Sequence, residues 1–247
     1  MIVLDVIESA LGTIEVVQRR LSGSLLYKQG GVCQSEADRN GASLASYVHA
    51  IHGLILQNNI RNVLVIGCGG GTLATMLVRS GLEVALIDID PTSFVIARKY
   101  FKLPVTVECH VSDGKSFLRR SRSFYDAIVV DAYHGDRVPA HLESRAFFDL
   151  ARQRLSAGGA VFANVHLQND FDHRADRVAI CMGSVWNDVR ILDSEGATDR
   201  NAIVMGGAVR QLRPPNAAIQ PAIDARLIER ELLSMKFRPY RTDIPEQ

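Results

Sequence analysis

A glycine-rich stretch constrains the fold of this chain more than any other feature. Residues 67–72 (GCGGGT) directly follow the apolar run 63–66 (VLVI) and open a segment, 72–79, with the apolar spacing of a helix. Glycine lets the backbone turn tightly and lets a ligand lie against it, and the free amides at a helix start can donate hydrogen bonds. The stretch therefore predicts a strand, a ligand-binding turn and a helix.

The same alternation of strand-like and helix-like segments continues along the chain. Apolar runs that fit strands lie at 63–66, 84–87, 105–109, 125–130, 160–165, 189–192 and 202–205, and most are separated by amphipathic segments of helical length. Such alternation is typical of βαβ units around a parallel sheet. We expect a Rossmann-like α/β domain over residues 58–210.

Shorter segments flank this domain. Glycines separate short apolar runs between residues 7 and 34, as in β-hairpins, and residues 43–57 have the spacing of a helix. Two prolines at 214 and 215 precede a last helical segment at about 221–235. We expect three parts: a hairpin appendage with a lead-in helix (1–57), the α/β domain (58–210), and a C-terminal linker and helix (211–247).

Acidic residues stand at the ends of two further predicted strands. Asp88 follows the second strand, seventeen residues after Gly71, and Asp113 precedes Gly114 after the third. A carboxylate at the first position can accept hydrogen bonds from both hydroxyls of a ribose. Asp113 and the amide of Gly114 can meet the edge of an adenine, a feature that a dinucleotide fingerprint does not include. Together with the glycine turn, these residues predict a crevice for a nucleoside.

These motifs resemble those of the polyamine aminopropyltransferases, the spermidine and spermine synthases, over about residues 11–205. The hairpin segments 11–16 and 31–34, the glycine turn, 88–91, 112–114 and 125–131 are all similar to family segments. Val65 stands two residues before the first glycine, where the family has an apolar residue and ordinary methyltransferases usually have an acid. The resemblance implies the seven-stranded Rossmann-like fold of S-adenosylmethionine-dependent methyltransferases, with a small N-terminal β-hairpin appendage.

The resemblance also implies roles for individual residues. Asp131, at the end of the fourth strand, corresponds to the catalytic acid, and Tyr47, Tyr133 and Asp136 are candidates for the side that binds the acceptor amine. The residues implied in nucleoside binding are Gln34, Gly67, Gly69, Gly71, Asp88, Asp113 and Gly114.

The chemistry of the implied reaction explains the acid at position 131. Transfer of an aminopropyl group from decarboxylated S-adenosylmethionine needs an unprotonated amine whose lone pair is aimed at the reacting carbon. A carboxylate at the strand end can take the amine's proton and hold the ammonium that develops. We therefore expect a spermidine synthase-like transferase that acts on a di- or polyamine.

The sequence departs from the family pattern on the amine side. Gly70 stands where the family's glycine turn carries an acid, His134 replaces the second acid of the catalytic loop, and Val48 and His49 replace polar or acidic groups. An acid at position 70 would repel the carboxylate of intact S-adenosylmethionine, so its loss leaves the donor open between the intact and decarboxylated forms. The alternatives are a methyltransferase with an unknown acceptor and a nucleoside-binding protein without activity.

Composition sets limits on other functions. The formal net charge is +1, from 28 basic and 27 acidic residues, so no global field favours nucleic acid or a membrane surface as partner. Four distant cysteines form no C-x-x-C pair, and no H-E-x-x-H or G-x-S-x-G motif is present, so we expect neither a metal nor a serine hydrolase site. No apolar run reaches the length of a membrane span. We expect a cytoplasmic protein, and the family resemblance implies a homodimer.

Overall fold

The computed structural model describes residues 1–133, 135 and 137–244. Its larger sheet contains strands β5 (Asn62–Ile66), β6 (Glu83–Asp88), β7 (Glu108–Val111), β8 (Tyr125–Val130), β9 (Leu155–Leu167), β10 (Val189–Asp193), β11 (Arg200–Gly207) and β12 (Lys236–Arg238). Their order is β12-β10-β11-β9-β8-β5-β6-β7. Strands β5 to β9 pair in parallel, whereas β11 pairs antiparallel with both β9 and β10. The predicted Rossmann-like α/β fold is confirmed.

The short strand β12 differs from the prediction. The sequence predicts seven strands, and the structure adds β12 as an eighth, paired antiparallel with β10 at the sheet edge. Three residues are too few to show a strand periodicity, so this strand depends on tertiary contacts. Arg238 within it donates to the Asp193 carboxylate at 3.0 Å.

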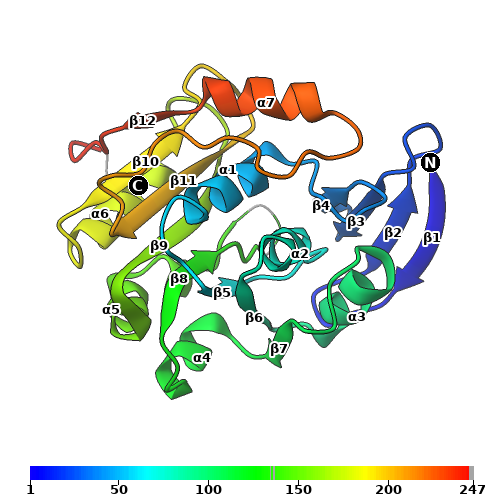
Figure 1. Cartoon of the computed structure of the whole chain (residues 1–247), viewed down its shortest axis with the longest axis horizontal. Helices are drawn as coiled ribbons and strands as arrows, with labels where there is room; N and C mark the ends of the chain where they lie inside the picture. Colours follow the sequence, from blue (N-terminus) through cyan, green and yellow to red (C-terminus); the bar gives the residue numbers. More distant parts are fainter. Residues whose placement is uncertain (134, 136, 245–247) are drawn as a thin grey trace.

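Helices cover both faces of the sheet (Figure 1). They are α1 (Ser46–Ile55), α2 (Thr72–Arg79), α3 (Pro91–Tyr100), α4 (Gly114–Arg120), the 3-10 turn η1 (Ala140–Leu142), α5 (Arg145–Arg154), α6 (Arg174–Gly183) and α7 (Ala225–Ser234). One buried apolar cluster joins α1, α2, α3 and α7 to one face, and a second joins α4, α5 and α6 to the other. Burial on both faces explains why the runs in β5 and β8 are apolar throughout.

A separate antiparallel sheet forms the N-terminal appendage. It contains β1 (Ile2–Ile7), β2 (Ile14–Gln18), β3 (Leu25–Gln29) and β4 (Val32–Ala37) and lies beside α3 (Figure 1). The ring of Tyr27 packs edge-on to Phe101 with centroids 6.4 Å apart, and Asp5 pairs with Lys99 at 2.9 Å. These contacts fix the appendage over the end of the sheet where the nucleoside site is expected.

Over the described ranges, none of the helices combines the length and the apolar character needed to cross a bilayer.

Candidate active site

A cavity of about 450 Å³ lies at the carboxyl ends of β5, β6 and β8, beneath the N-terminal sheet. Most of the predicted site residues line it: Gln34, Tyr47, Gly67, Gly69, Asp88, Asp113, Gly114, Asp131 and Tyr133. Gly71 lies in the same turn but does not line this cavity. Asp136 and His134, named from the sequence, lie outside the described residues. The structure thus gathers segments distant in sequence around one space, as the strand-end argument predicts.

The glycine turn is shaped by close backbone approaches. Gly67 has φ +103°, and a Cβ there would overlap the main chain at Asp131, so only glycine lets the ends of β5 and β8 meet. Gly71 has φ +65° and caps α2. The amide of Gly70 donates to the Ser35 hydroxyl at 3.0 Å, which connects the turn to β4 of the appendage.

Asp88 holds the turn from the end of the neighbouring strand. Its Oδ2 accepts from the Cys68 amide at 2.7 Å and its Oδ1 from the Asp90 amide at 2.8 Å. Burial raises the pKa of Asp88, although these backbone donors act in the opposite direction. A carboxylate has about four acceptor positions, so two amide bonds leave positions for hydroxyl groups of a ligand.

Asp113 begins α4 and faces the cavity from the third strand end. Its Oδ1 accepts from the Ser116 amide at 2.8 Å, and its Oδ2 lies 2.6 Å from His141 Nε2. Burial alone would raise the pKa of Asp113, but the bonds from His141 and Ser116 bring it below the usual value. Gly114 is needed beside it because a Cβ would lie 2.5 Å from the Ile66 side chain.

Asp131 lies at the end of β8 and is held by two side chains. Asn164 Nδ2 donates to its Oδ1 at 2.8 Å, and the Tyr47 hydroxyl donates to its Oδ2 at 3.3 Å. Burial raises the pKa of Asp131 to about 6, and both hydrogen bonds limit that rise. This carboxylate is ionised at neutral pH yet close enough to its pKa to accept a proton.

Asn164 is the principal site residue that the sequence reasoning missed. It is fully buried near the end of β9, and its Oδ1 accepts from Asn201 of β11 at 3.0 Å. Its backbone oxygen accepts from the Tyr133 hydroxyl at 3.0 Å. The only signal in the sequence is a polar residue inside the apolar run 160–165. No motif in the sequence singles out His141, because its pairing with Asp113 forms only in the folded loop.

Gly70 is buried rather than open to the cavity. A Cβ at this position would lie 3.0 Å from Phe101 and 3.1 Å from Ser35. The space next to the turn is therefore filled by the side chains of Phe101 and Ser35.

No trio of His, Cys, Asp or Glu side chains within residues 1–133, 135 and 137–244 is arranged to hold a metal ion.

The comparisons with known proteins agree with this geometry. The model of the spermine/spermidine synthase domain matches residues 46–175. The chain belongs to the spermine/spermidine synthase family. A relative described as a probable polyamine aminopropyl transferase, from Bifidobacterium longum, is 30% identical over 126 residues, which cover 50% of this chain and 28% of the relative. The chain spans about half or less of the length of such curated relatives.

Solved structures show the same fold at low identity. The crystal structure of a probable spermidine synthase from Corynebacterium glutamicum has a TM-score of 0.76 and 19% identity, covering 95% of this chain and 90% of the other. Human methyltransferase-like protein 13, solved in complex with SAH, has a TM-score of 0.52 and 21% identity, covering 81% of this chain and 93% of the other. The fold is thus shared with both transferase groups.

Proposed function

We propose that the protein transfers an aminopropyl group from decarboxylated S-adenosylmethionine to an amine. Family membership supports the reaction class. The observation that carries the proposal is the position of Asp131, which lines the same cavity as Asp88 and Asp113. Its pKa of about 6 suits a group that accepts a proton near neutral pH. The nucleoside would lie between the carboxylates of Asp88 and Asp113, and the amine beside Asp131.

In this proposal Asp131 orients the amine and takes its proton. The nitrogen of the acceptor amine forms a bond to the aminopropyl carbon that is attached to sulfur, as the bond between that carbon and sulfur breaks. The electron pair of the broken bond stays on sulfur, which leaves methylthioadenosine, and the amine's proton moves to an Asp131 oxygen. Tyr47 and Asn164 keep the carboxylate in a single orientation, which favours a reactive geometry.

The nucleoside residues support the proposed binding mode. Asp88 keeps free acceptor positions for ribose hydroxyls, and the Asp113 carboxylate is ionised and fixed by His141. Gly67 and Gly69 line the cavity with backbone alone, so a ligand can approach the turn closely.

A methyltransferase that uses intact S-adenosylmethionine is the second candidate. The observation that favours it is Gly70, because the turn lacks the charge that would repel the donor's carboxylate. Donor identity therefore distinguishes the two functions. The purified protein would be incubated with each donor and a panel of amines, and the nucleoside product identified by mass spectrometry.

Each candidate gives its own product. Methylthioadenosine that appears only with decarboxylated donor and amine, and is lost in Asp131→Asn, supports aminopropyl transfer. S-adenosylhomocysteine from the intact donor contradicts it in favour of methyl transfer. Binding of methylthioadenosine without turnover of either donor indicates a nucleoside-binding protein.

We also propose a homodimer. Strand β1 is at the edge of the N-terminal sheet, and several of its apolar side chains are exposed, such as Val3 (57%) and Val6 (55%). An exposed apolar edge strand favours pairing with another chain. Sedimentation at several concentrations tests this, and a monomer throughout contradicts it. The cytoplasmic location stays a prediction.

A further inference from the structure

A second cavity, of about 750 Å³, adjoins the nucleoside cavity on the side of β9. The two cavities share Tyr133, Arg137 and Val138 in their walls. The second cavity continues along η1, the end of β9 and the first turn of α6. A molecule whose amine lies at Asp131 would reach into this space past Tyr133.

The described walls of the second cavity carry more cationic than anionic side chains. Three arginines, Arg137, Arg174 and Arg177, face two carboxyl groups, Asp172 and Glu143. Arg174 pairs with Asp172 through its Nε, at 2.9 Å and 3.0 Å, and through its Nη2, at 2.5 Å. This pairing satisfies the aspartate within the protein.

Glu143 is the second carboxyl group that lines this cavity, and two of the cavity's arginines act on it. Burial raises the pKa of its carboxyl group, against the effect of Arg174 and Arg177 nearby. Within the part of the chain that the structure describes, the guanidinium groups of Arg137 and Arg177 form no ion pair or hydrogen bond. A guanidinium binds a carboxylate through two parallel hydrogen bonds, and it repels an ammonium group.

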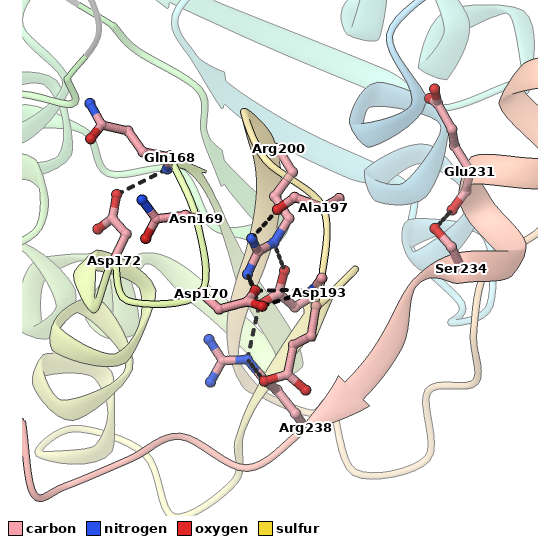
Figure 2. Close-up of polar contacts among 12 residues, drawn as sticks. Gln168, Asn169, Asp170, Asp172, Asp193, Ala197, Arg200, Glu231, Ser234 and Arg238 are labelled. Carbon is pink, nitrogen blue, oxygen red and sulfur yellow. Dashed lines mark hydrogen bonds and ion pairs between the residues drawn. The ribbon is translucent and has the colours of Figure 1, made fainter.

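The loop after β9, whose residues Gln168, Asn169 and Phe171 line this cavity, is held in place by a network of charged side chains. Asp170, in the loop after β9, accepts from the Gly196 amide at 3.0 Å. It also pairs with Arg200 at 2.9 Å (Figure 2). Arg200 in turn pairs with the buried Asp193 at 2.7 Å, and Arg238 joins the same carboxylate (Figure 2). This network connects the loop to β10, β11 and β12. A wall fixed in this way needs little ordering when a ligand binds.

Apolar side chains complete the cavity. Val138, Ala140, Val165 and Phe171 line it as well, and Phe171 is 87% exposed. Their surfaces suit the methylene chain of an aliphatic amine.

We propose that the acceptor is an aliphatic amine that also carries a carboxylate, with its amine at Asp131 and its carboxylate at Arg177 and Arg137. The proposal rests on the proposed function for the place of the amine. It predicts selection against a plain diamine, because the second ammonium group of a diamine would face these arginines.

The test compares diamines that differ only in a carboxylate. Binding of ornithine and of putrescine, and of lysine and of cadaverine, would be measured by calorimetry on the full chain saturated with methylthioadenosine. We expect the carboxylated member of each pair to bind at least about tenfold more tightly, since a charged hydrogen bond changes affinity by that order. Equal affinity, tighter binding of the plain diamine, or no binding of either carboxylated amine overturns the proposal.

Variants identify the responsible charge. Arg177→Gln should reduce the preference for ornithine about tenfold, and Arg137→Gln should reduce it in the same direction. Arg145→Gln is the matched control, because Arg145 is exposed on the neighbouring helix α5 and does not line the cavity. Thermal melting checks that each variant folds. A preference that Arg177→Gln and Arg137→Gln leave unchanged overturns the proposal.

The arginines could instead bind the carboxylate of intact S-adenosylmethionine, the other carboxylate that could lie in this cavity. If the arginines bind it, Arg177→Gln weakens the binding of S-adenosylhomocysteine relative to that of methylthioadenosine and does not change the ornithine preference, which overturns the proposal.

Turnover separates this inference from the proposed function. Methylthioadenosine release with putrescine but not ornithine contradicts only the inference. Methyl transfer to ornithine contradicts only the aminopropyl transfer.

Discussion

Asn164 Nδ2 donates to Asp131 Oδ1 at 2.8 Å, which connects the ends of the neighbouring strands β9 and β8. This donor stabilises the ionised carboxylate and so opposes the effect of burial on its pKa. The bond gives Asp131 both a fixed orientation and a pKa that suits proton transfer near neutral pH.

Removing this donor should change the pH dependence of activity. Wild-type kcat/KM should rise with pH through about 6, because Asp131 must be ionised to accept a proton. In Asn164→Ala the pKa of Asp131 rises further, so the acidic limb moves to higher pH. Tyr47→Phe removes the longer 3.3 Å bond and should give a smaller shift in the same direction. Superimposable acidic limbs for wild type and Asn164→Ala would contradict this role.

The raised pKa of Asp131 also predicts a pH dependence of stability. The folded pKa of about 6 lies above the value of an unfolded aspartate, so its contribution to stability is present at low pH and is lost as pH rises through about 6. Asp131→Asn has no charge to bury. Its unfolding free energy relative to wild type should increase by about 1 kcal/mol between pH 5 and pH 8. Urea unfolding measures this, and a constant difference would contradict it.

An acid introduced at position 70 should lower the free energy of unfolding. Gly70→Asp places a Cβ 3.0 Å from Phe101 and 3.1 Å from Ser35 and buries a carboxylate beside them. We expect a loss of about 2–4 kcal/mol in unfolding free energy from overpacking and burial of charge. Gly70→Ala, the control, carries only the steric part and should lose less. A Gly70→Asp variant as stable as wild type would show that the turn has room for the acid.

The buried ion pairs that hold β12 should contribute much more to the free energy of unfolding than ion pairs on the surface. Arg238 pairs with Asp176 and Asp193, whose side chains are 2% and 0% exposed. Arg238→Gln removes a positive charge that balances these two buried carboxylates, so we expect a loss of about 3–5 kcal/mol in unfolding free energy. Arg241→Gln is the control, because Arg241 and its partner Glu195 are both about half exposed, and it should change stability by at most about 1 kcal/mol. Similar losses in the two variants would contradict the importance of the buried network.

The sequence predicts the parts of the fold that depend on long apolar runs and glycine. Strands β5 and β8 lie at the predicted places because both faces of each are buried, and Gly67 is required by the close approach of Asp131. The third strand is less well predicted. The apolar run 105–109 suggests it, whereas β7 covers Glu108–Val111, because pairing with β6 rather than burial decides the position of this partly exposed edge strand.

The site shows the same division. The strand-end rule predicts that Asp88, Asp113 and Asp131 lie around one space, since the carboxyl ends of parallel strands share an edge. Asn164, His141 and the arginines of the second cavity come from segments whose side-chain directions depend on tertiary packing. No local pattern in the sequence predicts that Asn164 meets Asp131.

The most direct test of the proposed function is the nucleoside that the protein releases in a single turnover. Wild-type protein in excess over decarboxylated S-adenosylmethionine, with an amine acceptor, should convert the donor to methylthioadenosine. Asp131→Asn should bind methylthioadenosine with wild-type affinity and release it from the donor at least about a hundredfold more slowly, the scale of a lost general base. Unchanged release in Asp131→Asn, or S-adenosylhomocysteine formed from the intact donor instead, would contradict the account.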